Sequence, residues 1–355
     1  MTRVKSLTRI DLVLRTTSPW HVAYPGNDKK SPDGGLAALT LTKKIGRQRT
    51  PYFTANGIRG SLRRHARDHL IPHLTTNNAI STDFFNGLSC GASKGQPDNS
   101  PNSVEELTRY PEHIYMGLFG GGARILPGSL QVSDINVICE DTMELHMVPN
   151  NKDMASSLEM MFPHVFGEEP IKPYQFLDKR HLTRVDDIMK GMSPDEISRI
   201  EGDKEAVAEH YSSVVENKKA RAGGEKKSSL SNLIEIQVIP ENTPMHFSVS
   251  LLPSATESQL GLLLMSLESL FRTNYIGGYG RVGFGQYRLE EMHLQSEVYD
   301  IEIRTSADQM YDDSNTFVLP SDYKDYIKEA EADLDAVNRE EFESYFQNIK
   351  QKKSA

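Results

Sequence analysis

The chain has little cysteine and no long apolar run, and each shortage excludes a class of protein. Among its 355 residues are two cysteines, Cys90 and Cys139, which lie far apart and fit no paired metal-ligand spacing. A disulfide framework is therefore excluded, and both residues are expected to be reduced thiols in a cytoplasm. No apolar run approaches a membrane span, and the first five residues lack a hydrophobic signal region. We therefore expect a cytoplasmic protein with no membrane partner.

Acidic residues are scarce at the start of the chain, and basic residues are scarce at its end. Residues 1–75 contain fourteen Lys or Arg, four Asp and no Glu, a net charge of +10. Residues 290–355 contain seventeen Asp or Glu and seven Lys or Arg, a net charge of −10. The total of −9 argues against a uniformly basic nucleic-acid binder, but this distribution lets one end hold polyphosphate while the other stays off it. The same charge distribution also fits a protein whose charges only keep it soluble and bind no ligand.

Glycine is concentrated in one place, where five glycines occur among the nine residues 277–285. Glycine lets backbone N–H groups approach a ligand without an intervening Cβ, and a run of such groups forms a concavity suited to phosphate. The candidate binding residues here are Gly277, Gly278, Tyr279, Gly280 and Arg281. The same glycines satisfy the dinucleotide-binding pattern, but that pattern needs a strand before it and a helix after it. Here the expected order is helix, glycines, strand, which excludes a dinucleotide site. Two interpretations of the loop remain: a contact with a phosphodiester backbone, or a simple turn that binds no ligand.

A second basic feature is an amphipathic helix predicted from about residue 56 to residue 70. Apolar residues recur every four positions and predict the buried stripe. Asn56 is the expected N-cap, and Pro72 is expected to end the helix. A second row of the helix carries cations that we expect to contact phosphate: Arg59, Arg63, Arg64 and Arg67.

Periodicity elsewhere predicts an α+β fold with insertions. Residues 9–15 predict a strand, 16–50 a long loop, 75–112 a loop-rich insertion, 130–137 a strand, 150–230 a charged helical block, 233–239 and 245–251 a hairpin, 257–272 a helix, 286–293 a strand, and 321–350 a helix. This order is compatible with a ferredoxin-like core. The helical block ends in a basic stretch that contains Lys218, Lys219 and Arg221, which is either a solvated loop or a nucleic-acid contact that orders on binding.

Five segments in this order resemble the RAMP superfamily of CRISPR-associated proteins, specifically the Cas-seven group of guide-RNA-binding backbone subunits. They are TSPWHV at 17–22, NGIRGSLR at 56–63, LFG at 118–120 with VSD at 132–134, IPENTPM at 239–245, and YIGGYGRVGFG at 275–285. The family's serine pair at the helix start is replaced here by Asn56 and Gly57, and its lysine by Arg59. The 24–26 loop and the helical insertion lean towards the type IV branch.

The resemblance implies a hand-like fold in a prokaryotic cytoplasm. Residues 1–150 and 231–300 would form an RRM-like palm, 151–230 a helical insertion with a thumb, and 301–355 an acidic helical segment. Many copies would line one guide RNA as a helical filament that pairs with target DNA or RNA, together with other subunits and a helicase. Ser18, His21 and Asn56 would join the glycines and arginines in holding the RNA backbone. Asn56 lies at the helix N-terminus, where the N–H groups and the helix dipole favour phosphate. Base pairing would supply the sequence specificity, so no cofactor and no catalytic residue is expected.

Rival interpretations remain open. Relatives in type III complexes cut target RNA with an acidic residue after the first strand, where Asp28 and Asp33 lie. Processing nucleases of the superfamily use a histidine, and His21 near Tyr24 occupies a comparable place. His65, His69 and His73 are i, i+4 neighbours, but no Cys or carboxylate completes a zinc set, so no metal is expected. A scaffold that binds no nucleic acid also fits the composition.

Overall fold

The computed structural model describes residues 7–30, 36–75, 79–92, 104–146, 154–167, 169–183 and 233–347. The chain forms two compact units. The first unit comprises Met1–Trp20, Thr42–Phe176 and Pro240–Ala355, and the second comprises His21–Leu41 and Leu177–Ile239. Each unit has its own sheet. Among the described residues, no helix is long and apolar enough to cross a membrane.

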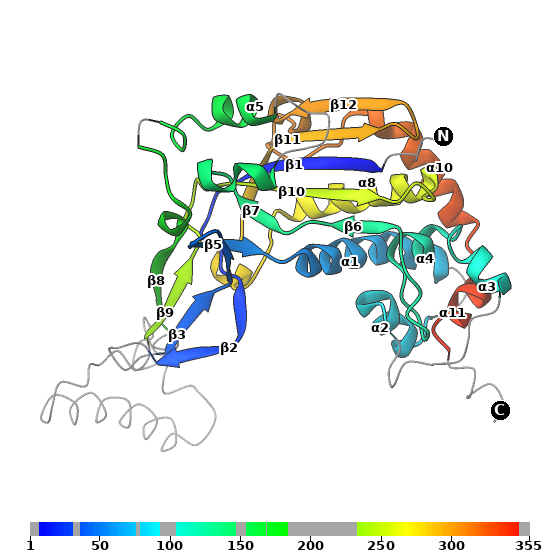
Figure 1. Cartoon of the computed structure of the whole chain (residues 1–355). Coiled ribbons are helices and arrows are strands. Elements are labelled where there is room, and N and C mark those ends of the chain that lie inside the picture. Colours follow the sequence, from blue (N-terminus) through cyan, green and yellow to red (C-terminus); the bar gives the residue numbers. More distant parts are fainter. Residues whose placement is uncertain are drawn as a thin grey trace, which may run out of the picture. The chain divides into compact units, whose positions relative to one another are not determined.

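The first unit is built on an eight-stranded antiparallel sheet (Figure 1). Its strands in spatial order are β12 (Ile301–Ser306), β11 (Tyr287–Ser296), β1 (Thr8–Thr16), β10 (Pro244–Leu251), β7 (Ile135–Val137), β5 (Gln48–Phe53) and β4 (Thr42–Ile45), with β6 (Leu130–Val132) also paired to β10. The central strands are buried on both faces, so the alternation expected from the sequence does not extend to their burial. In β1, Ile10, Leu12 and Leu14 are buried as predicted, but Asp11 and Val13 between them are buried too. Leu12 lies opposite Phe247 of β10.

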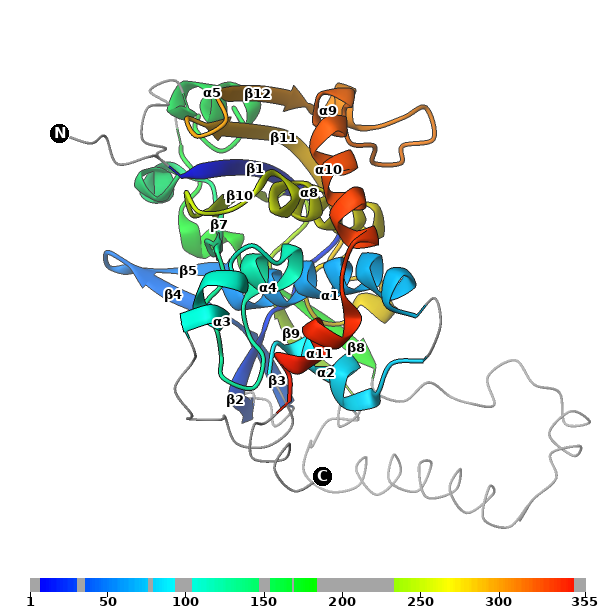
Figure 2. The ribbon, with the colours of Figure 1, turned by 90° about the vertical axis from the view of Figure 1, so that its right-hand side faces the viewer.

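Helices cover one face of this sheet (Figure 2). The helix α1 (Ala55–Leu74) packs against α8 (Glu257–Thr273), which in turn packs against α10 (Lys324–Asp335). The ring of His69 on α1 reaches α8, where its Nε2 lies 2.8 Å from the Ser269 hydroxyl. The buried leucines of α8 form the centre of the core. Burial of this apolar face is the main source of stability for such a layer.

The remaining described helices are short. They are α2 (Thr82–Cys90), α3 (Val104–Arg109), α4 (Ile114–Phe119), α5 (Met154–Met161), α9 (Ala307–Met310) and α11 (Arg339–Ser344), with 3₁₀ turns η1 (Glu140–Leu145), η2 (Pro173–Phe176), η4 (Gly280–Val282) and η5 (Ser321–Tyr323). The predicted loop-rich insertion at 75–112 thus contains α2 and α3. The α+β class expected from the sequence is confirmed.

Two strands that were expected to form a hairpin lie in different sheets. The strand β9 (Leu233–Val238) pairs with two strands of the second unit, whereas β10 pairs with β1, β6 and β7 of the first unit. The hairpin prediction is therefore wrong. Alternation and a proline turn predict two neighbouring strands, but they do not specify the partner of each strand, which is set by long-range packing.

The predicted loop at 16–50 is mostly β-structure. It holds β2 (Ala23–Lys30), β3 (Leu36–Thr40), β4 and the start of β5. Its many glycines and prolines indicated turns, and the short strands between those turns are too weakly periodic to be seen in the sequence.

The C-terminal segment also differs from expectation. It begins with the edge strand β12 before any long helix, and the single helix predicted over 321–350 is two helices, α10 and α11. Asn338 separates them, because its side chain accepts a hydrogen bond from the Glu341 N–H at 3.1 Å and so starts a new helix. The strand predicted over 130–137 is likewise divided into β6 and β7.

The second unit has a four-stranded sheet in the order β2-β3-β9-β8, where β8 spans Asp178–Thr183. The pair β3–β9 is parallel, and the other two pairs are antiparallel. A buried polar group joins its strands: Thr40 donates its hydroxyl hydrogen to the carbonyl of Gln237, and Nδ1 of His21 lies 2.8 Å from the same carbonyl.

Candidate nucleic-acid interface

The glycine-rich loop is closed at its base by backbone hydrogen bonds. It starts where α8 ends at Asn274, a left-handed C-cap with φ 55°. The N–H of Ile276 donates to Gly285 O at 2.9 Å, and the N–H of Gly285 donates to Pro19 O at 2.9 Å. Gly285 has φ +89°, and a Cβ at this position would lie 2.3 Å from Ile276 O. The base of the loop therefore requires glycine at 285.

The tip of the loop holds a non-glycine residue in a left-handed conformation. Tyr279 has φ 60° and starts the 3₁₀ turn η4, which ends at Gly283. A residue with a Cβ is rarely found there, and such strain concentrates at ligand sites. The ring of Tyr279 lies 6.2 Å from that of Phe284, which anchors the tip to a buried side chain.

The loop exposes both large apolar side chains and a cation. Tyr275, Tyr279 and Val282 have exposed fractions of 44%, 38% and 56%. Arg281 is exposed, and it makes no ion pair or hydrogen bond within the described residues. Exposed rings next to a guanidinium are the groups that stack on bases and bind phosphate. The loop can therefore hold a sugar-phosphate chain without reading its sequence.

A buried tryptophan joins the loop to the start of α1. Trp20 is fully buried, and its indole N–H donates to Gln286 O at 2.8 Å. Its ring meets Tyr287 edge-on at 5.7 Å, and it meets Phe53, at the end of β5, at 6.4 Å. The glycine-rich loop and the first turn of α1 are therefore parts of one packed region. No pattern in the sequence predicts this role for Trp20.

Ser18, predicted to contact RNA, has a structural bond. It is buried, and its hydroxyl oxygen accepts a hydrogen bond from the Gln286 N–H at 2.9 Å. This bond fixes the strand that leaves the glycine-rich loop. Ser18 therefore positions the loop, and its oxygen is not directed to solvent.

The first turn of α1 is capped differently from the prediction. Thr54 is the N-cap, and its hydroxyl accepts from the Gly57 N–H at 3.3 Å, so the prediction of Asn56 as the cap is wrong. Asp134 accepts from the Ala55 N–H at 2.9 Å and also pairs with Lys43 at 2.9 Å. A carboxylate of the protein thus occupies the place where a phosphate was expected. Asn56 itself is exposed at this turn.

Two of the four arginines on α1 bind inside the protein. Arg63 is only 7% exposed and donates to Phe119 O at 2.7 Å and to Gly120 O at 3.1 Å. Arg59 donates to the same Phe119 oxygen at 2.7 Å, and burial, with the nearby Arg63 charge, lowers the pKa of Arg59. These cations neutralise the carbonyl end of α4. The prediction that Arg63 grips phosphate is therefore corrected: its guanidinium is enclosed.

The other two arginines of α1 differ from each other. The guanidinium of Arg67 lies 4.6 Å from the centre of the Phe85 ring and donates to the Ser89 hydroxyl at 2.7 Å, so it mainly fastens α2. Arg64 is exposed and has no hydrogen bond or ion pair within the described residues. Of this predicted row, Arg64 is the member that is open to an external phosphate. Pro72 does not end the helix and lies in its last turn.

The remaining predicted residues lie in the second unit or outside the described chain. His21 is buried, and burial lowers its pKa, so the ring is neutral and bonded to the Gln237 carbonyl. Asp28 belongs to β2, where its backbone pairs with Ala38, and is not in a turn. The residues that fall outside the described ones are Asp33, Lys218, Lys219 and Arg221.

The histidines of α1 do not converge. Nε2 of His69 faces Ser269, while Nδ1 of His73 lies 2.8 Å from Asp335 on α10. In the part of the chain that the structure describes, no three His, Cys, Asp or Glu side chains are grouped to hold a metal ion.

One basic surface was missed at the level of the sequence. The hairpin β4–β5 exposes Lys44, Arg47 and Arg49. The signal was present, because residues 42–49 contain four cations and no acid. It was hidden inside a segment that was interpreted as a loop.

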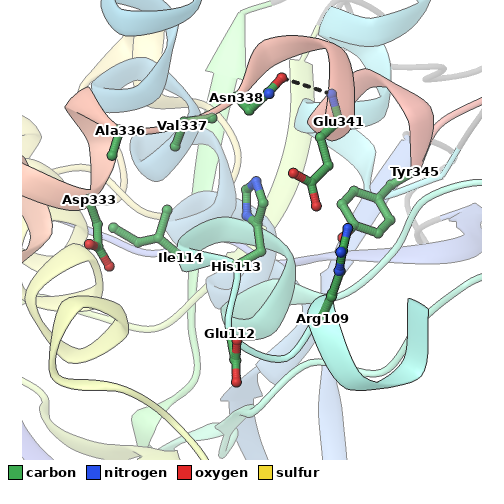
Figure 3. A pocket seen from close by; sticks show the side chains of 10 residues that line it. All are labelled: Arg109, Glu112, His113, Ile114, Asp333, Ala336, Val337, Asn338, Glu341 and Tyr345. Atoms are coloured by element: carbon green, nitrogen blue, oxygen red, sulfur yellow. Dashed lines mark hydrogen bonds between the residues drawn. The ribbon is translucent and has the colours of Figure 1, made fainter. Parts of the chain in front are cut away.

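An acidic pocket lies on the helices of the same unit (Figure 3). It has a volume of about 420 Å³ and is bounded by α3, α4, α10 and α11. Its charged lining residues are Arg109, Glu112, Asp333 and Glu341. Three carboxylates against one cation disfavour phosphate, so this pocket does not extend the candidate interface.

Comparisons with known proteins give a distant likeness. No family model matches the sequence, and no curated protein matches it. Among solved structures, a chain of a type IV-B CRISPR complex is similar, with a TM-score of 0.45 and 16% sequence identity over 86% of this chain and 100% of that chain. This likeness is too distant to carry a functional argument.

Proposed function

We propose that this chain binds the backbone of a CRISPR guide RNA and assembles with copies of itself into the filament of an RNA-guided effector complex of type IV. The observation that carries the proposal is the glycine-rich loop, whose tip exposes Tyr279 and Arg281 over a strained backbone. Among the residues that the structure describes, Arg281 has no partner. Such a surface binds ribose-phosphate and stacks on bases without preference for sequence. That is the requirement when base pairing supplies the specificity.

The chain order of the first unit supports an RRM-like palm. The succession β1, α1, β7, β10, α8, β11 follows the βαββαβ pattern, and the spatial order β11-β1-β10-β7 is the one that a ferredoxin-like unit has. We assign the palm to this set of elements. The loop that leaves α8 then lies at one end of the palm, next to the first turn of α1.

We propose a structural role without catalysis. Target cleavage would need a carboxylate organised beside the RNA, and Asp28 is a member of a paired strand. A general acid or base would need an accessible ring, whereas His21 is buried against Gln237. Interference would then depend on partners such as a helicase. We assign the thumb to a part of residues 186–230, which lie outside the described ones.

The test is to express the full chain with and without a CRISPR array and to purify it. We expect strong absorbance at 260 nm only with the array, and sequencing of the bound RNA should return guide sequences protected at regular intervals. Protein that is free of RNA under both conditions would support a scaffold. Labelled complementary RNA that the assembled complex cuts at regular intervals in the presence of Mg²⁺, and no longer cuts after Asp28→Ala or Asp33→Ala, would support the target-cleaving alternative.

A further inference from the structure

The hairpin β4–β5 carries three exposed cations that form no ion pair with any residue in the described part of the chain. Its register places Lys44 directly opposite Arg49, and Arg47 lies in the turn between the strands. All three side chains are exposed, and none has a hydrogen bond or ion pair within the described residues. Like charges opposite each other destabilise a strand pair. The arrangement therefore carries an energetic cost that an external anion would remove.

The hairpin extends from the sheet, and its base is held firmly. β4 is the outermost strand on its side, and the pair projects away from the helices of the unit (Figure 2). At the base, Lys43 pairs with Asp134 at 2.9 Å and lies 4.7 Å from the centre of the Tyr52 ring. The hairpin is therefore an arm that is held at its base and whose cationic side chains meet solvent.

The arm is continuous with the candidate interface. β5 ends at Phe53, whose ring contacts Trp20, and Trp20 bonds the strand that leaves the glycine-rich loop. Asp134, which holds Lys43, also accepts from the first N–H of α1. One packed region thus connects the three exposed cations of the hairpin to Arg281.

We propose that Lys44, Arg47 and Arg49 bind consecutive phosphates of a nucleic-acid strand, as an arm that extends the interface of the glycine-rich loop. This inference rests on the proposed function. Exposed cations on a hairpin that is held at its base suit a phosphate backbone, because the backbone offers one negative charge at each nucleotide whatever the base sequence. A protein partner would need carboxylates in matching positions. The acidic pocket of a second copy is a candidate of that kind, and the test includes it.

The test compares the salt dependence of nucleic-acid binding for the full chain and for the triple variant Lys44→Ala, Arg47→Ala, Arg49→Ala. Single-strand binding loses about 0.7 in the slope of log K against log salt for each lost phosphate contact, so we expect a decrease of about 2. The matched control is Lys324→Ala with Lys328→Ala, which removes two exposed cations from α10 and should leave the slope unchanged. Thermal unfolding of the control should match that of the wild type, and the triple variant should be at least as stable, because it removes the like charges at Lys44 and Arg49.

Two titrations identify which nucleic-acid strand the hairpin binds. The protein is titrated first with a single-stranded guide RNA and then with the guide paired to its target. A change with the guide alone assigns the arm to the guide, and a change only with the paired duplex assigns it to the target strand. Either result supports the proposal.

Three results would overturn it. If the triple variant keeps the wild-type slope in both titrations while Arg281→Ala lowers it, the hairpin does not bind phosphate and the proposed function stands. If the slope is unchanged and self-association measured by sedimentation is lost, the hairpin is a contact between copies. If the wild-type chain binds no nucleic acid in either titration, both the proposed function and the proposed role of the hairpin are wrong.

Discussion

Arg63 and Arg281 belong to the same unit and have opposite environments. Arg63 is enclosed between α1 and the end of α4, with its guanidinium bonded to two carbonyl oxygens. Arg281 stands on a strained loop with no partner among the described residues. The basic motifs predict RNA binding for both residues. A basic motif shows where cations are, but burial and hydrogen bonding decide which of them are open to a ligand.

The largest expected effect comes from Arg63. Replacing Arg63 with Ala removes two charged hydrogen bonds and leaves the Phe119 and Gly120 carbonyls without this donor. We expect the free energy of unfolding to fall by about 3 kcal/mol, because a lost bond to a charged group costs roughly 1.5 to 3 kcal/mol. Thermal unfolding measures this. The control is Arg64→Ala, on the exposed side of the same helix, which should cost less than about 0.5 kcal/mol. If Arg63→Ala has a normal melting temperature but no longer binds RNA, then Arg63 binds RNA and does not stabilise the fold.

The next effect separates the base of the glycine-rich loop from its tip. Gly285→Ala places a Cβ 2.3 Å from Ile276 O in a left-handed backbone, so the base must open. We expect a loss of about 2 kcal/mol, within the range of strained backbone positions, together with weaker RNA binding. Gly283→Ala has a similar φ of +87° but no atom within 4 Å of the new Cβ, so it should cost less. Equal melting temperatures for the two variants would show that the base is not rigid.

The elements of this fold were more predictable than their partners. The strand at 8–16, the helix at 257–273 and the glycines after it follow from periodicity and composition. The separation of β9 from β10 does not, because strand pairing depends on distant packing. The roles of Trp20 and Arg63 also depend on contacts between residues far apart in sequence. The composition of residues 42–49 indicated a basic segment, but only the structure shows that this segment is a hairpin.

A smaller effect concerns pH and the buried helical side of the first unit. His113 caps α4, since its Nδ1 accepts from the N–H groups of Tyr115 and Met116 at 3.1 and 3.2 Å. Burial lowers the pKa of His113 to about 4, from 6.5. Between these values the unfolded chain binds a proton that the folded chain does not, so stability falls as pH falls through this window, by about 1.4 kcal/mol per pH unit at most.

His146 adds to the same pH dependence, because burial lowers its pKa to about 3. The variant His113→Asn retains a capping side chain and cannot titrate, so its stability should decline less steeply between pH 6.5 and pH 4.5. Denaturant unfolding at several pH values gives the slopes. A variant as steep as wild type would show that His113 is not the titrating group.

The most direct test of the account is the salt dependence of RNA binding by Arg281→Ala, measured with two single-stranded RNAs of unrelated sequence. We predict that the slope of log K against log salt decreases by about 0.7 for both RNAs, as expected for one lost phosphate contact. Arg281→Lys keeps the charge and should retain the wild-type slope, and the melting temperature should not change in either variant. An unchanged slope in Arg281→Ala, or a change with only one of the RNAs, would contradict backbone binding by the glycine-rich loop.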